Sequence, residues 1–293
     1  MAVGLVWEQR PALVRPLLVA AFSGWNDAGD AASGAAEWLL RRGHGPRVAM
    51  IDCDEYVDYQ SRRPTVELEE GVTRTVHWPT TEIHATSVGG RDLVVVRGVE
   101  PNLRWRGYCD AVLEVARDTG CEMVVTLGAL IGDVVHTREV PVTGTSTDPD
   151  LVTRPDLMRS QYEGPTGIVG VLQDACREAG IPAVSLWAPV PHYVSNPPNP
   201  AATRALLARL GALAGLSLEL DGLDELVDVW RHQVDRAVDD NDELAEYIHG
   251  IEAQMDEAPA ASDPGPVLQP GPEEVAELAN EVERYLREQG GNE

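Results

Sequence analysis

The stretch Pro16-Leu-Leu-Val-Ala-Ala-Phe22, followed by Ser-Gly-Trp-Asn-Asp-Ala-Gly-Asp30, decides the fold. Its first half is a short apolar run, which is typical of a strand buried on both faces of a sheet. Its second half is a polar turn, in which Asn26 or Asp27 can cap a following helix. The small residues at 31–36 let that helix lie close to the sheet. A buried strand that leads directly into a helix indicates an α/β fold.

The same order of strand and helix recurs through the first two thirds of the chain. Brief apolar runs bounded by turn residues predict further buried strands at residues 47–52, 92–97, 122–127 and 182–187. Amphipathic stretches between them predict helices at about 28–42, 104–118, 166–179 and 200–214. This alternation predicts a three-layer α/β/α core with a mostly parallel sheet.

One segment interrupts the alternation, at about residues 56–87. Within it, Thr65 to Glu69 and Val72 to Trp78 alternate between apolar and polar residues around Glu70-Gly71, which is the pattern of a β-hairpin. An inserted hairpin often serves pairing between subunits, so we expect this one to be available for self-association.

The pattern changes again after the core, which we place at residues 1–218. Residues 219–293 form an acidic helical region, with an apolar stripe on Leu223, Leu226, Trp230, Val234 and Val238. A linker at 258–272, rich in proline, glycine and serine, leads to a last helix. These helices either pack on the core as a cover or await a partner.

Charge excludes several classes of function. The formal net charge is −25, and residues 219–293 alone hold 22 acidic residues against four arginines. Binding to nucleic acids or anionic membranes needs a basic face, so we expect neither partner. All 23 basic residues are arginines, which excludes phosphate-binding loops and Schiff bases that require a lysine.

Cofactor and metal motifs are also missing from the sequence. It has no Rossmann fingerprint, GxSxG elbow or HExxH motif, and its four cysteines form no CxxC pair. We therefore predict no cofactor, no metal site and reduced thiols. Residues 1–10 lack the features of a signal peptide, and no apolar run approaches the ~18 residues of a membrane span, so we expect a cytoplasmic protein.

Candidate site residues follow the carboxyl ends of the predicted strands, where ligands bind in open α/β sheets. His136 and His192 can titrate near neutral pH, Arg138 can hold an anion, and Asp27 and Asp30 lie about one helical turn apart. Thr166 can cap a helix whose free amides could hold an anion. The full candidate set is Asn26, Asp27, Asp30, His136, Thr137, Arg138, Thr166, His192 and Tyr193. Capping and local hydrogen bonding explain the same residues equally simply.

At these motifs the chain resembles the proteasome assembly chaperone 2 family, in its actinobacterial branch. The matching stretches are Phe22 to Asp30, Leu127 to Arg138, Tyr162 to Gly167 and Pro191 to Pro198. The resemblance implies a core similar to that of nucleoside phosphorylases, and self-association, with a trimer as the candidate assembly. In eukaryotic relatives it implies a chaperone role in building the proteasome α-ring, which makes proteasome subunits candidate partners.

Three hypotheses of function follow. The leading one is an oligomeric, non-catalytic assembly factor or scaffold. The rival is an enzyme or binding protein for nucleoside-like or anionic small molecules, with a pocket at the strand ends under the C-terminal helices. The third is a protein-interaction module that uses the acidic region 219–293.

Overall fold

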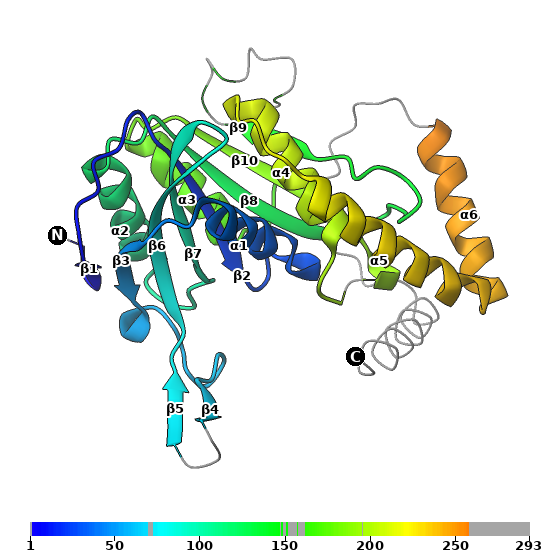
Figure 1. Ribbon diagram of the computed structural model, residues 1–293, viewed down its shortest axis with the longest axis horizontal. Helices are drawn as coiled ribbons and strands as arrows, with labels where there is room; N and C mark the ends of the chain where they lie inside the picture. The colour runs from blue at the N-terminus through cyan, green and yellow to red at the C-terminus, as the bar shows by residue number, and fades with distance from the viewer. Residues whose placement is uncertain are drawn as a thin grey trace.

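The chain forms a mixed eight-stranded sheet in the order β1-β3-β6-β7-β2-β8-β10-β9 (Figure 1). The computed structural model describes residues 2–69, 73–146, 148, 151, 157, 162–194 and 196–257. The strands of this sheet are β1 (Leu5–Trp7), β2 (Leu17–Ser23), β3 (Arg47–Asp52), β6 (Thr80–Val88), β7 (Arg91–Val99), β8 (Met123–Gly132), β9 (Thr143–Ser146) and β10 (Ala183–Pro191). Its centre, β7-β2-β8-β10, is parallel, and β1, β6 and β9 pair with their neighbours in the antiparallel direction. The predicted parallel arrangement is confirmed for the centre of the sheet, and the sheet as a whole is mixed, since four of its seven pairings are antiparallel.

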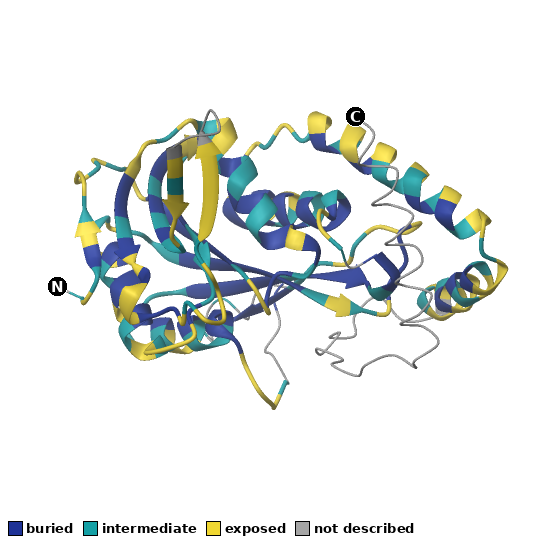
Figure 2. Ribbon diagram, turned by 90° about the horizontal axis from the view of Figure 1, so that it is seen from below, coloured by how far each residue is buried: buried dark blue, intermediate teal, exposed yellow. Residues whose placement is uncertain are grey.

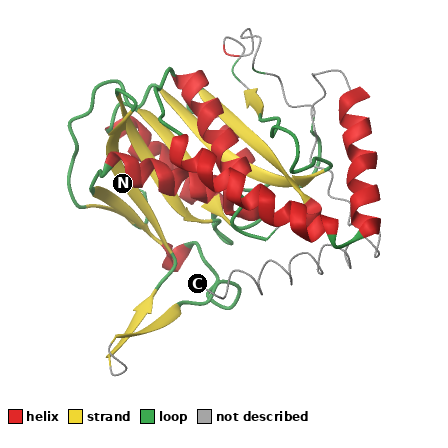
Figure 3. Ribbon diagram, turned by 45° about the vertical axis from the view of Figure 1, so that its right-hand side comes forward, coloured by secondary structure: helices red, strands yellow, loops and turns green. Residues whose placement is uncertain are grey.

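Helices cover both faces of this sheet, which confirms the three-layer architecture (Figures 1 and 3). On one face, α1 (Ala31–Gly43) and α4 (Pro200–Ala214) pack against Leu17, Val19 and Ala21 of β2. On the other, α2 (Trp105–Asp118) and α3 (Ile168–Glu178) pack in the cluster that holds the alternate residues of the same strand. Each fully buried leucine or valine of these clusters contributes roughly 1.5–3 kcal/mol.

The predicted hairpin is present but shorter than the segment assigned to it. Strands β4 (Thr65–Glu69) and β5 (Thr73–His77) form a separate two-stranded sheet that projects from the body (Figure 1). The end of the predicted segment, however, is β6, which lies between β3 and β7 in the main sheet. In β6 the buried Ile83 and Ala85 alternate with less buried neighbours, so its pattern has the same period of two as a hairpin strand.

The C-terminal helices α5 (Asp221–Asp239) and α6 (Asp242–Glu257) pack on loops of the core. They bury a third cluster, whose members include Val135 and Tyr193 from the core and Val234, Leu244 and Ile248 from the helices. Figure 2 shows buried and exposed residues alternating along both helices. The covering interpretation is therefore confirmed for α5 and α6, whereas the predicted linker and last helix lie outside the described residues.

One residue of the predicted stripe on α5 is misplaced. Leu226 is 56% exposed, whereas the adjacent Val227 is 4% exposed. The buried positions Leu223, Val227, Val234 and Ala237 are four, seven and three residues apart, as a helix packed on one face requires. Leu226 and Val227 both fit a helical spacing after Leu223, so spacing alone does not distinguish them.

Candidate functional site

The candidate residues lie at the carboxyl edge of the parallel strands. A bridge between Asp27 and Ala129 joins the turn after β2 to β8, and β8 and β10 pair as far as Gly132 and Pro191. The loops after these three strands therefore start at one edge of the sheet, as the sequence predicts.

Asn26 belongs to a buried junction between the strand ends and α3. Its Nδ2 donates to Oε1 of Glu100 over 2.7 Å, and the same oxygen accepts from the Ile168 backbone N–H over 2.9 Å. Glu100 therefore satisfies the first amide of α3. The sequence analysis missed this carboxylate, although it follows a predicted strand and so lies on the same edge. The Oδ1 atom of Asn26 is buried and has no hydrogen-bond partner among the described residues.

Asp27 caps α1, as the sequence allows. Its Oδ1 accepts from the backbone N–H groups of Ala32, over 2.7 Å, and Ser33, over 3.1 Å. Burial raises the pKa of this carboxyl, an effect that the hydrogen bonds from Ser33 and Ala32 oppose. Its Oδ2 is buried without a hydrogen-bond partner among the described residues. Asp30 is exposed and occupies the left-handed region with φ 48°, directly before the helix.

His136 forms the centre of a second, separate cluster. The hydroxyl of Tyr193 accepts from the His136 backbone N–H over 2.9 Å and lies 2.8 Å from Nδ1 of the same residue. Nε2 lies 3.0 Å from Oδ1 of Asp235, and because a carboxylate can only accept, Nε2 carries the ring hydrogen and donates it. In the neutral ring Nδ1 is then the acceptor, and the Tyr193 hydroxyl donates its proton to it. The arrangement fixes the tautomer and connects two core loops to α5.

The electrostatics of this cluster keep His136 neutral. Burial lowers the pKa of the imidazole, and the opposing effect of Asp235 is smaller. The side chain of Asp235 is half exposed, which weakens its effect on the ring. A neutral imidazole between a hydroxyl and a carboxylate could relay a proton, but burial of Tyr193 raises the pKa of its phenol and keeps the hydroxyl protonated.

Thr137 and Arg138 face the C-terminal helices. The Thr137 hydroxyl donates to Glu252, and Nη2 of Arg138 lies 3.1 Å from Oδ2 of Asp256, both on α6. In the opposite direction, Arg231 of α5 donates to the His136 carbonyl over 3.1 Å. The predicted anion-binding arginine thus contacts carboxylates of its own chain.

His192 packs against α6, whereas Thr166 lies at the surface before α3. The His192 ring stacks edge-on against Tyr247 of α6, with ring centroids 5.3 Å apart, and its Nε2 has no hydrogen-bond partner among the described residues. Burial lowers the pKa of this imidazole, and Asp133 opposes that shift. Thr166 is exposed, and the prediction that it caps α3 is wrong, because Gly167 is the capping residue.

In the described part of the chain, seven of the nine candidates divide into two groups. Asn26 and Asp27 stabilise helix starts, whereas His136, Thr137, Arg138, His192 and Tyr193 contact one another or the C-terminal helices. Two surface hollows, of about 520 and 590 Å³, are lined by none of the nine. Within the described part of the chain, no group of three or more His, Cys, Asp or Glu residues is arranged to hold a metal ion.

Comparison of the sequence with models of known protein families identifies the family of this chain. The sequence model of the PAC2 family matches residues 21–238, which is more than half of the chain. The chain belongs to the PAC2 family. A comparison with curated proteins gave no match.

Solved structures of PAC2 relatives share both fold and sequence with this chain. A PAC2 family protein from Streptomyces avermitilis is 54% identical with a TM-score of 0.75, and the alignment covers 80% of this chain and 99% of that one. The proteasome-assembly chaperone homologue Rv2125 of Mycobacterium tuberculosis is 45% identical with a TM-score of 0.73, with coverages of 79% and 99%. The M. tuberculosis protein of unknown function Rv2714 is 28% identical with a TM-score of 0.78, with coverages of 86% and 88%.

The PAC2 match includes most of α5 but not α6. It ends at Val238, so Asp235 and Arg231, which hold the His136 loop, lie inside the matched region. The partners of Thr137 and Arg138 on α6 lie beyond it. The residues that attach α5 to the strand ends thus lie inside the matched region, whereas those of α6 lie outside it.

Proposed function

We propose that this PAC2 protein is an oligomeric, non-catalytic assembly factor or scaffold that binds proteasome subunits. The proposal rests on what the polar side chains at the carboxyl edge of the sheet bind. His136, Thr137 and Arg138 bind α5 and α6, so the chemistry available at this edge fastens helices. The M. tuberculosis relative, which is described as a proteasome-assembly chaperone homologue, supports the choice of partner.

The outer face of α5 is the surface that we assign to the partner. Leu226 and Val229 are each 56% exposed, and the neighbouring Glu225 and Asp228 are also exposed. An apolar pair among carboxylates suits a partner that presents apolar side chains surrounded by arginine or lysine. A partner bound at this surface would agree with two of the hypotheses: the assembly factor and the protein-interaction module that uses the acidic region.

Capture of proteasome α-subunits by the immobilised full chain tests the proposal. We expect Leu226→Ser to reduce capture at least about tenfold, since exposed apolar residues at the centre of an interface contribute on the order of 1–2 kcal/mol or more. Leu103→Ser is the matched control, because Leu103 is 50% exposed on a loop before α2. Failure of the wild-type chain to capture α-subunits or their assembly intermediates would reject the proposal.

The proposal includes a cytoplasmic, homo-oligomeric protein, with a trimer as the candidate assembly. Within the described residues, no helix is both long and apolar enough to cross a membrane. All four cysteines are free, and burial raises the pKa of Cys109 and of Cys176 to about 12. Such thiols stay protonated and unreactive, as suits a reducing compartment.

One observation favours the small-molecule hypothesis as a second candidate. Three buried atoms at the strand ends, Asn26 Oδ1, Asp27 Oδ2 and His192 Nε2, have no hydrogen-bond partner among the described residues. Unsatisfied buried polar atoms are uncommon, and a polar ligand is one way to satisfy them. Thermal unfolding with millimolar phosphate or adenosine tests this candidate. A ligand-dependent rise in melting temperature that Asp27→Asn removes would support it, and no shift with either probe would count against it.

A further inference from the structure

The β4–β5 hairpin presents an uncovered apolar face. Val66 and Val76 lie opposite each other in its register, and Leu68, two residues along β4, shares their face. Arg74 pairs with Leu68 and so lies on this face as well, and Trp78 follows the end of β5. The four apolar side chains are between 45% and 58% exposed. A two-stranded ribbon is marginally stable in water, and Figure 2 shows this one standing almost wholly exposed. Its apolar face therefore needs a cover.

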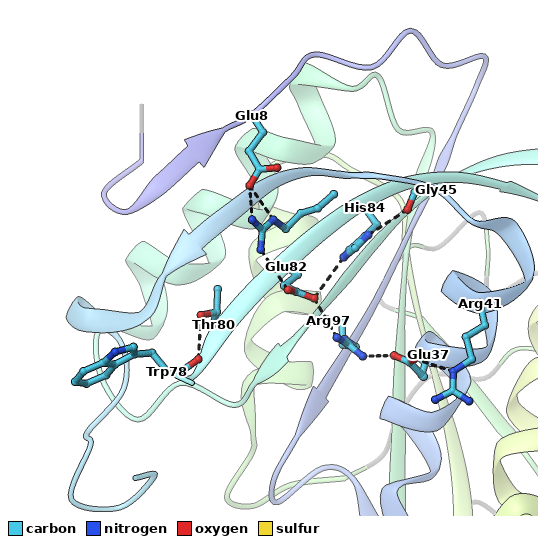
Figure 4. A network of polar contacts seen from close by, with 10 residues as sticks. Glu8, Glu37, Arg41, Gly45, Trp78, Thr80, Glu82, His84 and Arg97 are labelled. Atoms are coloured by element: carbon cyan, nitrogen blue, oxygen red, sulfur yellow. Dashed lines mark hydrogen bonds and ion pairs between the residues drawn. The ribbon is translucent and has the colours of Figure 1, made fainter. Parts of the chain in front are cut away.

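A hollow of about 590 Å³ lies at the base of the same hairpin. Val76 and Trp78 line one side of it, and Glu82 and Arg97 from β6 and β7 line another. Figure 4 shows these charges paired: Arg97 contacts Glu82 over 3.0 Å and also Glu37, and Glu82 contacts His84. Hydrogen bonds from His84 and Arg97 lower the pKa of Glu82 to about 2. The charges that line the hollow are thus already satisfied within the chain.

We propose that the hairpin and this hollow form the contact between two copies of the chain. The apolar face of one copy's hairpin covers the hollow and the hairpin base of the other. The inference names the surface for the self-association included in the proposed function, and its test does not involve the proteasome.

Local charge argues for a second copy as the occupant. Two chains of net charge −25 repel each other across most of their surfaces. Residues 60–78, by contrast, hold three arginines and three glutamates, so their formal charges cancel. A basic partner would be attracted to the acidic helices α5 and α6, whereas a neutral apolar patch is where two acidic copies can meet.

The size of the hairpin argues that the hollow takes part. A five-residue strand is about 16 Å long. Two such strands offer far less than the roughly 800 Å² per partner that a stable interface buries. A contact between hairpins alone would therefore be weak. Inserting the apolar face of one copy against the hollow and Trp78 of the next adds the missing area, as a ring of three copies requires. The paired charges there leave no carboxylate or guanidinium without its partner.

Sedimentation velocity of the full chain at 1–100 µM tests the inference. We expect the wild type to sediment as a multiple of the 31.7 kDa chain. Val66→Glu should weaken association at least about 100-fold, because it forces an unpaired carboxylate into the contact. Val6→Glu is the matched control, since Val6 on strand β1 is 51% exposed against 54% for Val66, and it should leave the mass unchanged.

A second variant separates lost contact from a melted hairpin. Val66→Thr keeps the shape and β-branching of valine but replaces one methyl group with a hydroxyl, so the strand persists while association should weaken about tenfold. A wild type that is monomeric at 100 µM would overturn the inference. So would an oligomer that Val66→Glu leaves intact, or one that Val6→Glu dissociates.

Discussion

Replacing Tyr193 by phenylalanine should loosen the C-terminal helices while leaving the packed ring in place. The tyrosine is fully buried, and its hydroxyl is the partner of both the His136 backbone N–H and its Nδ1. Phenylalanine fills the same volume but leaves both groups buried and unsatisfied. Each orphaned group costs about 1–3 kcal/mol, so we expect the free energy of unfolding to fall by about 2–4 kcal/mol.

The loss should be concentrated at α5. Without the hydroxyl, Asp235 alone holds the imidazole, and the His136 loop loses its second anchor beneath α5. Amide hydrogen exchange in α5 should therefore accelerate by about 30-fold or more, since each 1.4 kcal/mol is a factor of ten. Exchange in the strands of the parallel centre should change only by global unfolding.

Tyr247→Phe is the control for this measurement. Tyr247 lies on α6 and packs edge-on against His192, but no hydrogen bond of its hydroxyl is found among the described residues. Removing this hydroxyl should lower the free energy of unfolding by less than about 0.5 kcal/mol. If Tyr193→Phe costs no more than this control, or leaves exchange in α5 unchanged, the argument that the strand-end cluster fastens the helix is wrong.

Three further predictions concern the same edge of the sheet. Burial lowers the pKa of His136 below 6.5, so the unfolded chain takes up a proton at a higher pH than the folded chain does. The free energy of unfolding should therefore keep its full value above about pH 6.5 and fall below it, and the fall should be less steep in His136→Asn. Urea titrations between pH 8 and 5 measure both slopes. Asp27→Ala should cost about 1–2 kcal/mol through the lost cap, whereas Asp27→Asn, which keeps an acceptor and removes a buried charge, should be near neutral at pH 7, as thermal unfolding can show. Gly167→Ala should lower the melting temperature more than Asp27→Ala does, because the new Cβ would lie 2.3 Å from Oδ1 of Asn26. A melting temperature equal to that of the wild type would contradict this close approach.

Five of the eight strands of the main sheet and its four covering helices were predictable because each carries its own local pattern, whereas β1, β6 and β9 were not predicted as strands of this sheet. The predicted strand at 47–52 and the predicted helix at 200–214 have the bounds of β3 and α4. Periodicity and turn residues are properties of neighbouring residues, and they are read directly from the sequence.

Strand ends were less predictable, because they depend on pairing partners. The predicted ends at Leu127 and Trp187 precede the true ends of β8 and β10, where Gly128 and Pro189 read as turn signals. In the structure, a Cβ on Gly128 would lie 2.6 Å from the Trp187 ring, so glycine makes room for the indole of the paired strand. Proline is tolerated in β10 because β9 pairs only up to Trp187, which leaves that side of the strand open.

The partners of the candidate residues could not be predicted at all. Asp235 lies 99 residues from His136, and Glu100 lies 74 residues from Asn26. Such pairs follow from the packing of distant elements and leave no periodic signal. The analysis of strand ends found half of each pair, since the carboxyl edge collects loops, but only the tertiary fold supplies the other half.

The carboxyl edge of a parallel sheet gathers helix starts, loop amides and polar side chains, and these groups need either a ligand or a cover. In this chain the covering helices carry the complementary groups, since Asp235, Glu252 and Asp256 meet the histidine, threonine and arginine of one loop. A ligand at this loop would have to displace those carboxylates. The cover in turn exposes Leu226 and Val229 on its outer face, so the surface available to a partner lies on the helices rather than at the strand ends. The polar motifs that mark the edge in the sequence thus bear on function by holding that surface in place.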